Sequence, residues 1–393
     1  MKAFVATDFR IHLYNGKPYA FEKHYVVMER YYRAFGKLIL CCRCIEDETL
    51  PEGFREISGM VQETVPVEAL LGVLLGKYRQ ALRERIGQCD LVICRCHGMI
   101  PFRAFDAARG LGKPVLAEAM ACAWDGYWNH GLEGKLLAPY MFLKMRQVMK
   151  KSDYATYVTQ EFLQRRYPRE GGSLAASNVR LDGIEPGILA RRRARIQNLD
   201  PASPVLMTTA AVDVSYKGQQ YVIRALPKLN AVGIHAHYVL VGEGNPEKLR
   251  MLARRLGVEG QVEFAGRMPL EQVLQRLDAA DIYLQPSLQE GLPRAVIEAM
   301  SRGCLCIGAR TAGIPELLEP DFLVRRRSAA DLARSIAAAC RMTREQLEQQ
   351  AERNLLVAEK NYTAAVLEPR RAAYYRQIRR DIHQAADGAA DGS

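Results

Sequence analysis

Two glutamates eight positions apart carry the most specific chemical signal in this 393-residue sequence. Glu290 follows an apolar run typical of a buried strand, and Glu298 lies in a stretch with helical spacing. Pro293 suits the first position of that helix, because a proline there loses no intrahelical hydrogen bond. The free N–H groups of a helix start attract phosphate, and carboxylates beside them accept hydrogen bonds from hydroxyls. The pattern predicts a site for a diphosphate flanked by hydroxyls, as in a nucleotide sugar.

Neighbouring residues extend this predicted donor site. Arg294 lies one helical turn before Glu298 and on the same face. Gly291 and Leu292 can offer backbone N–H groups to the sugar or the diphosphate. Lys217 follows the first strand of the second half, where its ammonium could neutralise a departing diphosphate. The alternative is that the acids and the lysine are ordinary solvated side chains.

The run EGLPRAVIEAM, residues 290–300, resembles the E-x7-E motif of retaining GT-B glycosyltransferases of the family 4 type. The flanking ADIYLQPS and GIPELL resemble theirs too. The resemblance implies transfer of a hexosyl unit to an acceptor hydroxyl with the anomeric configuration kept, the leaving phosphate helping to take the acceptor's proton. It assigns Glu290 to the donor sugar and Glu298 to the ribose, as acids do in dinucleotide folds. No Asp-x-Asp element or histidine cluster predicts a metal, so no cofactor is expected.

Three further positions are assigned to the donor site. Gly266 and Met268 follow a short strand, in a loop that meets the nucleobase in the family. Gly242 belongs to a Gly-x-Gly turn after another strand, a pattern that more often marks only a tight turn. The sequence also departs from the family: residues 211–213, Ala-Val-Asp, stand where an arginine normally precedes the Lys-Gly pair.

The segment EAMACAWDGYWNHG, residues 118–131, predicts an acceptor site and holds both tryptophans of the chain. Aromatic rings stack on sugars, while aspartate and histidine bind sugar hydroxyls. We assign Asp125 as the base if a protein base assists, and we name five acceptor-side candidates: His97, Glu118, Trp124, Trp128 and His130. Two partly buried tryptophans that anchor a loop are the alternative, and a single histidine is more often structural.

Length and composition predict two globular domains, with 49% hydrophobic and 25% charged residues. No run is long enough to span a membrane, and the start lacks an apolar secretory region, so we expect a cytoplasmic protein. Ten cysteines without a CxxC pair predict buried reduced thiols.

The formal charge of +11 predicts an anionic partner. Residues 67–85 and 135–151 read as basic amphipathic helices that could contact the anionic inner membrane, or as solvated helices over a core. Nucleic acid is not expected, because aromatic-basic RNA motifs are absent. The run YVTQEFLQRRYP, residues 157–168, resembles bacterial capsule and exopolysaccharide glycosyltransferases, which implies a lipid-linked glycan acceptor; a UDP-sugar is the favoured donor. A nucleotide-sugar epimerase or hydrolase, or a basic non-catalytic binding protein, are the alternatives.

Strands and helices alternate in both halves, which predicts an α/β fold with parallel sheets. The expected architecture is GT-B, two Rossmann-like doubly wound domains facing across a cleft. The predicted helices of the first half include residues 20–35, 69–86 and 136–150, and its strands include 2–7 and 91–96. The predicted domains are 1–185 for the acceptor, 186–203 as linker, 204–365 for the nucleotide sugar, and 366–393 as a helix crossing back with a disordered tail.

Overall fold

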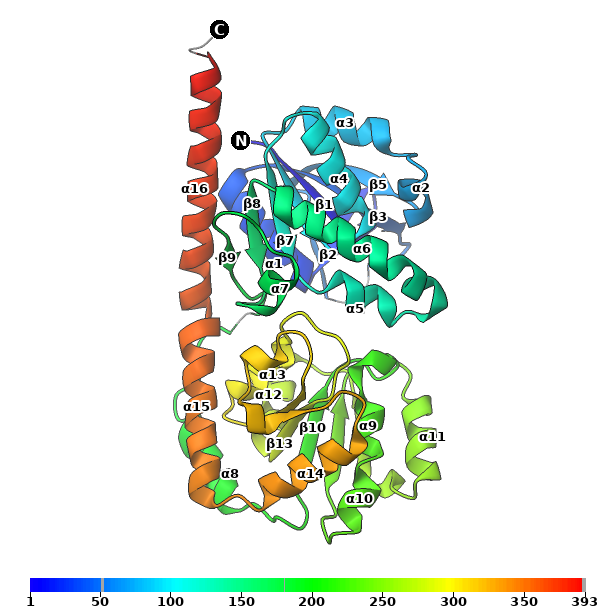
Figure 1. Ribbon diagram of the computed structural model, residues 1–393, viewed down its shortest axis with the longest axis vertical. Helices are drawn as coiled ribbons and strands as arrows, with labels where there is room; N and C mark the ends of the chain where they lie inside the picture. The colour runs from blue at the N-terminus through cyan, green and yellow to red at the C-terminus, as the bar shows by residue number, and fades with distance from the viewer. Residues whose placement is uncertain (51–52, 180, 391–393) are drawn as a thin grey trace. The chain divides into compact units, whose positions relative to one another are not determined.

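The computed structural model describes residues 1–50, 53–179 and 181–390 (Figure 1). The chain divides into two compact units. Unit 1 consists of Met1–Ala176 and Pro369–Ser393, and unit 2 consists of Ser177–Glu368. Each unit contains its own sheet and its own apolar core.

Unit 1 is built on a nine-stranded sheet in which seven strands are joined by parallel pairing. The order of these seven is β5 (Val61–Val67), β3 (Leu38–Glu46), β1 (Ala3–Tyr14), β6 (Leu91–Cys96), β7 (Val115–Ala119), β8 (Tyr154–Tyr157) and β9 (Leu174–Ala175). Every residue of β6 and β7 is buried, as expected for parallel strands covered on both faces.

A hairpin that the sequence analysis missed extends this sheet. Asn15 and Gly16 both have positive φ and join β1 to β2 (Lys17–Phe21), which runs antiparallel and in turn pairs with β4 (Phe54–Glu56). Asn-Gly is the preferred sequence of a two-residue hairpin turn. The helix predicted from residue 20 therefore begins only at Glu22.

The helices of unit 1 are α1 (Glu22–Phe35), α2 (Leu70–Leu74), α3 (Arg79–Gly87), α4 (Met99–Gly110), α5 (Ala123–Trp128), α6 (Gly131–Lys151) and α7 (Phe162–Arg166). The single helix predicted over 69–86 is wrong. Gly76 has a φ of 82°, in the left-handed region that ends a helix, and it separates α2 from α3.

The last helix, α16 (Ala364–Ala390), belongs to unit 1 from Pro369 onward. Tyr374 bonds to the backbone of Ala155, and Arg379 donates to the carbonyl oxygen of Ala34. Residues 385–390, predicted as part of a disordered tail, continue the helix, because their alanines favour helical backbone even without a core to bury. The remaining three residues of that predicted tail lie outside the described residues.

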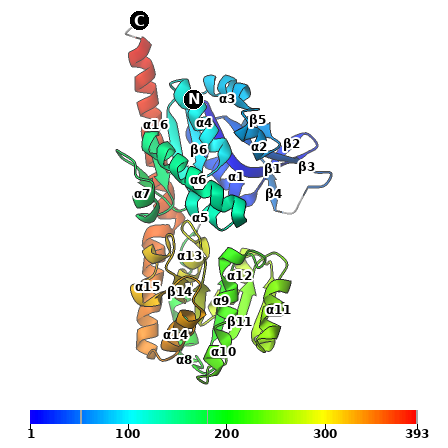
Figure 2. The ribbon, with the colours of Figure 1, turned by 45° about the vertical axis from the view of Figure 1, so that its right-hand side comes forward.

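Unit 2 has a fully parallel six-stranded sheet in the order β12-β11-β10-β13-β14-β15. Its strands are β10 (Val205–Thr209), β11 (His237–Val241), β12 (Val262–Gly266), β13 (Ile282–Gln285), β14 (Leu305–Ala309) and β15 (Leu323–Val324). Figures 1 and 2 show helices on both sides of these strands. They are α8 (Ile188–Gln197), α9 (Gln219–Ile223), α10 (Leu226–Asn230), α11 (Glu247–Arg255), α12 (Leu270–Ala279), α13 (Arg294–Met300), α14 (Ala329–Cys340) and α15 (Arg344–Tyr362), with four short 3₁₀ turns, η1 (Ser215–Lys217), η2 (Glu259–Gln261), η3 (Ile314–Glu316) and η4 (Pro320–Phe322).

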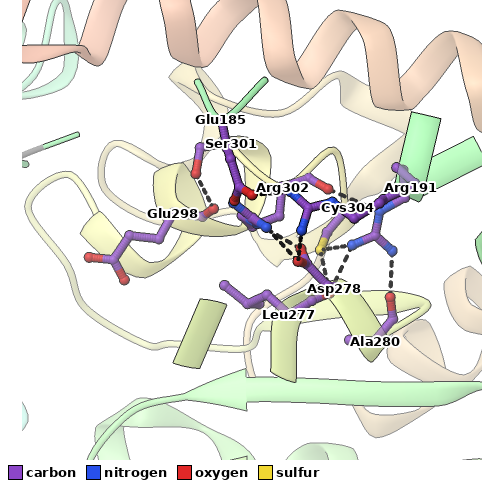
Figure 3. A network of polar contacts seen from close by, with 10 residues as sticks. Glu185, Arg191, Leu277, Asp278, Ala280, Glu298, Ser301, Arg302 and Cys304 are labelled. Carbon is purple, nitrogen blue, oxygen red and sulfur yellow. Dashed lines mark hydrogen bonds and ion pairs between the residues drawn. The ribbon is translucent and has the colours of Figure 1, made fainter. Parts of the chain in front are cut away.

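The segment predicted as a linker, residues 186–203, is mostly the helix α8 and is anchored to unit 2. Arg192 is 3% exposed and donates to the carbonyl oxygens of Leu277, Ala280 and Arg302 at 2.6–3.0 Å. Arg302 in turn bonds Asp278 and Glu185 in the network of Figure 3. An arginine-rich segment resembles a polar linker in sequence, because arginine is almost never fully buried unless its donors are satisfied.

We expect Arg192→Ala to destabilise unit 2 by about 3 kcal/mol or more, because it leaves buried carbonyl oxygens without donors. Urea unfolding would measure the change. Arg193→Ala is the matched control: the adjacent arginine is exposed, and its surface ion pairs with Glu348 and Glu352 are worth about 1 kcal/mol or less. Equal losses in both variants would contradict the anchoring role of Arg192.

Candidate functional site

The order of strands in unit 2 defines a switch point between β10 and β13. From β10 the sheet continues to β11 on one side and to β13 on the other. Loops at the carboxyl ends of these two strands therefore diverge, and ligands of open α/β sheets bind in the crevice so formed. Lys217 lies in η1 after β10, and Glu290 lies in the loop between β13 and α13.

The switch point brings the predicted Lys217 and Glu290 together. Lys217 Nζ is 2.8 Å from Glu290 Oε1, and Gln285 Nε2 donates to the same oxygen at 3.1 Å. Gln285 is fixed in turn by the Tyr283 hydroxyl, which donates to its Oε1 at 2.8 Å. The other carboxylate oxygen of Glu290 has no hydrogen bond in the described part of the chain. Glu290 is thus held at one oxygen and open at the other.

Close packing of backbone keeps the two loops together. Leu288 N donates to the carbonyl oxygen of Tyr216 at 2.7 Å. Gly218 has a φ of 81°, and a Cβ there would come 2.1 Å from the carbonyl oxygen of Pro286. Only glycine permits this approach, which accounts for the Lys-Gly pair in the sequence.

Glu298 in α13 is a partly buried acid without a partner. Its carboxylate makes no hydrogen bond or ion pair with the described residues, and Figure 3 shows it extending away from the network around Arg302. Burial raises the pKa of this carboxyl, while the charge of Arg294 acts in the opposite direction. An unpaired carboxylate in such a place costs stability, so a ligand that donates hydrogen bonds to it would be favoured.

Tyr283 lies within electrostatic reach of both glutamates. Burial raises its pKa, the Thr209 backbone N–H lowers it, and the charges of Glu298 and Glu290 raise it further. The two acids of the E-x7-E pattern thus surround one buried phenol that also positions Gln285. Sequence analysis named neither Tyr283 nor Gln285. Their alternate positions in β13, the strand that leads to Glu290, were the available signal.

The start of α13 differs from the prediction. Pro293 has extended backbone, with φ of −71° and ψ of 114°, and precedes the first helical residue, Arg294. The helix has seven residues, or about two turns, so its dipole is smaller than that of a long helix. Gly291 and Leu292 lie in the loop before it, and Gly313 N donates to Gly291 O at 2.9 Å. We therefore expect the charge of Lys217 to attract an anion at this site more strongly than the start of the helix does.

The loops after β10, β11 and β12 lie at the carboxyl edge of the sheet, on the opposite side of the switch point from β13. Gly242 N donates to Gly266 O at 2.9 Å, and a Cβ on Gly242 would come 2.0 Å from the Ala210 carbonyl oxygen. Met268 follows Gly266 by two residues. Asp213, at the place of the family's arginine, has its carboxyl group against Gly244.

Glu118, assigned to the acceptor side, lies inside unit 1. Its carboxylate accepts hydrogen bonds from Tyr31, from Arg95 Nε at 3.3 Å and from Tyr375 of α16 at 3.4 Å. It is 8% exposed. This arrangement differs from the exposed sugar ligand that the sequence suggested, and it connects the terminal helix to the sheet.

His97 is partly buried, and its Nδ1 atom is enclosed. Its Nδ1 has no partner in the described residues, and a Cβ on Gly126 of α5 would come 2.7 Å from its Nε2. Burial, with a smaller effect from His130, lowers the pKa of His97 to about 4. The imidazole is therefore neutral near pH 7 and packs against α5.

The remaining acceptor-side candidates gather on α5 and at the start of α6. Trp124 and Trp128 stack with ring centroids 5.1 Å apart and an interplanar angle of 16°, and Trp128 is 39% exposed. Asp125 lies between them, and its carboxylate has no hydrogen bond with the described residues. His130 precedes the first residue of α6. Trp128 is thus the exposed member of a stacked aromatic pair, on a helix that also carries the unbonded carboxylate of Asp125.

No group of three or more His, Cys, Asp or Glu side chains among the described residues could hold a metal ion. In the same part of the chain, no helix combines the length and the apolar character that a membrane span needs.

Comparison with known proteins defines the class. Residues 203–341 match the family model described as glycosyl transferases group 1. Protein CapJ of Staphylococcus aureus is 25% identical over 377 residues, covering 94% of this chain and 92% of the relative. The putative colanic acid biosynthesis glycosyltransferase WcaL of Escherichia coli is 34% identical over 157 residues, 37% of this chain and 39% of the relative.

Solved structures extend the similarity to the whole chain. HepE of Anabaena, described in complex with UDP-glucose, has a TM-score of 0.66 at 16% identity and covers 96% of this chain and 100% of its own. WaaG, described as a glycosyltransferase of lipopolysaccharide biosynthesis, has a TM-score of 0.61 at 16% identity, with 94% and 98% covered.

Residues 203–341 are therefore similar to group 1 glycosyltransferases, and the chain has the GT-B fold. The predicted fold class, two Rossmann-like α/β units of the GT-B type, is confirmed. The finer assignment to the retaining family 4 type stays a prediction, as do the roles of the individual site residues.

Proposed function

We propose that the protein transfers a hexosyl unit from a nucleotide diphosphate sugar, a UDP-sugar in the first instance, to an acceptor hydroxyl with retention of configuration. The bond from the anomeric carbon to the diphosphate oxygen breaks, and the acceptor oxygen bonds to the same face of that carbon. The acceptor's proton passes to the leaving diphosphate. No metal is required in this proposal, because Lys217 supplies positive charge to the departing group.

The observation that carries the proposal is that, of the two acids after β13, one is hydrogen-bonded within the protein and the other has no partner. Glu290 is fixed at one oxygen by Lys217 and Gln285, while Glu298 is partly buried and unpaired. In the proposed complex Glu298 accepts hydrogen bonds from the ribose, and the open oxygen of Glu290 accepts one from the donor sugar. Lys217 lies beside Glu290 and so reaches the diphosphate between the two.

Names of similar proteins support a sugar nucleotide but differ in the base. HepE is described with UDP-glucose, whereas a Corynebacterium glutamicum relative, 30% identical over 208 residues, is named a GDP-mannose-dependent mannosyltransferase. Gly242, Gly266 and Met268 lie at the edge where we place the base.

For the acceptor we propose a lipid-linked glycan intermediate of bacterial surface polysaccharide synthesis, used at the cytoplasmic face of the membrane. Relatives named for colanic acid and amylovoran biosynthesis support this proposal. The stacked Trp124 and Trp128 supply a face for a sugar ring, and Asp125 supplies a hydroxyl acceptor beside it.

Thermal unfolding with a panel of sugar nucleotides tests the donor. UDP-glucose, UDP-N-acetylglucosamine and GDP-mannose would be compared with UDP alone, at equal concentrations. A ligand at a hundred times its Kd should stabilise the fold by about 2.7 kcal/mol. Failure of every sugar nucleotide to stabilise the protein would sink the proposal.

A further inference from the structure

The loops after β13, β14 and β15 of unit 2 are joined to one another by hydrogen bonds. The carbonyl oxygen of Leu288, two residues before Glu290, accepts from Thr311 Oγ1 at 3.2 Å and from Arg326 Nη1 at 3.5 Å. Thr311 follows β14, and Arg326 follows β15. The loop that carries Glu290 is therefore fixed, on the side away from β10, by two further loops of the same sheet edge.

Three exposed arginines of these two added loops make no ion pair with a described acid: Arg310, Arg326 and Arg327, here called the arginine edge. The side chains of Arg310 and Arg327 make no hydrogen bond within the described residues, and that of Arg326 bonds only the carbonyl oxygen named above. Arg325, in contrast, is neutralised by Asp331, to which its Nη2 donates at 3.0 Å. Three positive charges are thus left at this edge, and they attract an anion.

The backbone of both loops is strained. Ala312 has a φ of 48° and Arg327 a φ of 61°, in the left-handed region that residues with a Cβ rarely adopt. The third non-glycine residue with positive φ among those described is Asn15, in a hairpin turn that requires it. Strain of this kind persists where surrounding contacts hold it, and it gathers at ligand sites. Strain and unpaired charge therefore coincide at the arginine edge.

The strand order of unit 2 separates the arginine edge from the nucleotide. β10, β11 and β12 lie on one side of the switch point, and the proposed donor complex has its base at the loops that follow them. β14 and β15 lie on the far side of β13. The donor sugar, at Glu290 in that complex, lies between the two groups of loops. A molecule that meets the donor sugar from the side of β14 and β15 is therefore the acceptor and not the nucleotide.

We propose that the arginine edge binds an anionic group of the acceptor, so that the acceptor is a charged glycan and not a neutral sugar. The chemistry it recognises is a carboxylate or a phosphate, whose oxygens accept hydrogen bonds from guanidinium groups. A uronic acid residue and a phosphate ester are the two sources of such a group. This inference rests on the proposed transfer reaction and names the class of its acceptor. Because the charged group is not the reacting hydroxyl, these arginines act on acceptor affinity and not on the chemical step.

Ligand-observed NMR titration of the full chain tests the anion site. The probes are methyl glucuronide, glucose phosphorylated at its primary hydroxyl, and the neutral methyl glucoside, each added with saturating UDP so that the donor site is filled. We expect one of the two anionic probes to bind about tenfold more tightly than methyl glucoside, and the double variant Arg310→Gln, Arg326→Gln to remove that difference. Tighter binding of the glucuronide identifies a uronic acid, and tighter binding of the phosphorylated sugar identifies a phosphate ester.

The double variant Arg255→Gln, Arg341→Gln is the charge-matched control. These exposed arginines lie at the carboxyl ends of α11 and α14, and neither has an ion pair within the described residues. An equal loss in the control would show general electrostatic attraction and overturn the site, as would equal binding of all three probes by the wild type. Arg327→Asn removes the third charge but keeps the left-handed backbone, which asparagine tolerates, and should weaken binding by about threefold. Thermal unfolding without ligand would verify that each variant is folded.

Transfer of labelled sugar to a bacterial glycolipid extract tests the acceptor role. With the donor that the sugar-nucleotide panel identifies, dilution of the extract gives an apparent KM and a kcat. The double variant of the arginine edge should raise KM by about tenfold and leave kcat unchanged. An unchanged KM with probe binding lost would overturn the acceptor as the source of the anion. Absence of transfer by the wild type, with its preference for an anionic probe intact, would refute the proposed reaction and with it the acceptor role, but not the anion site.

Discussion

Glu298→Ala is expected to abolish the thermal stabilisation that the sugar nucleotide gives to the wild-type protein. Two charge-assisted hydrogen bonds from ribose hydroxyls are lost, each worth about 1.5–3 kcal/mol, so Kd should rise about a hundredfold or more. Titration of unfolding midpoint against donor concentration measures this. The matched control is Glu271→Ala, at an exposed acid of α12. An undiminished shift in Glu298→Ala would remove the ribose assignment.

In the protein without ligand, the carboxyl of Glu298 should lower the free energy of unfolding by an amount that depends on pH. Burial raises the pKa of Glu298 above its usual value near 4.5, so the folded state binds this proton more tightly than the unfolded state. The stability contributed by the protonated carboxyl is present below the ordinary pKa and is lost as the pH rises through the raised one. Glu298→Gln should therefore gain stability over the wild type as the pH increases across that window.

Urea unfolding of Glu298→Gln and wild type at a series of pH values would measure this difference. Glu271→Gln should show none, because that side chain is exposed in both states. A pH-independent difference at Glu298 would mean that its carboxyl is solvated in the folded protein, against the burial described here.

Much of the fold could be predicted because its strands and helices leave patterns in short stretches of the sequence. The strand predicted over residues 91–96 matches β6, because an apolar run buried on both faces has a clear compositional signature. Lys217 and Glu290 were both singled out, although 73 residues separate them. Their proximity follows from parallel topology, which brings the carboxyl ends of adjacent strands to one edge of the sheet.

Features that depend on tertiary contacts were missed. Arg192 is buried only because carbonyl oxygens of other elements meet it, which no local pattern contains. The sequence suggested that Glu118 binds the acceptor. In the structure its carboxylate accepts hydrogen bonds from Tyr31 and Tyr375, which are far away in the sequence. The Asn15-Gly16 hairpin is different, because its turn signature is local and already stands in the sequence.

Lys217→Met should lower kcat by about a hundredfold to a thousandfold, the usual effect of removing a group that stabilises developing charge. The methionine keeps most of the side chain's length but removes the ammonium. Release of the nucleoside diphosphate from the donor that the panel identifies would measure kcat and KM separately. Lys217→Arg retains the charge and should restore part of the rate. Lys228→Met, at an exposed lysine of α10, should leave both constants unchanged.

A positional role for Lys217 would give a different result. Lys217 bonds Glu290 Oε1, so its loss could lower kcat merely by releasing that carboxylate. In that case Glu290→Gln and the double variant should have the same kcat as Lys217→Met, because the lysine would act only through the glutamate. If the ammonium acts on the leaving diphosphate itself, the double variant should be slower than either single variant. The residual hydrogen bond from Gln285 to the loop allows this comparison, since it helps to hold residue 290 when Lys217 is absent.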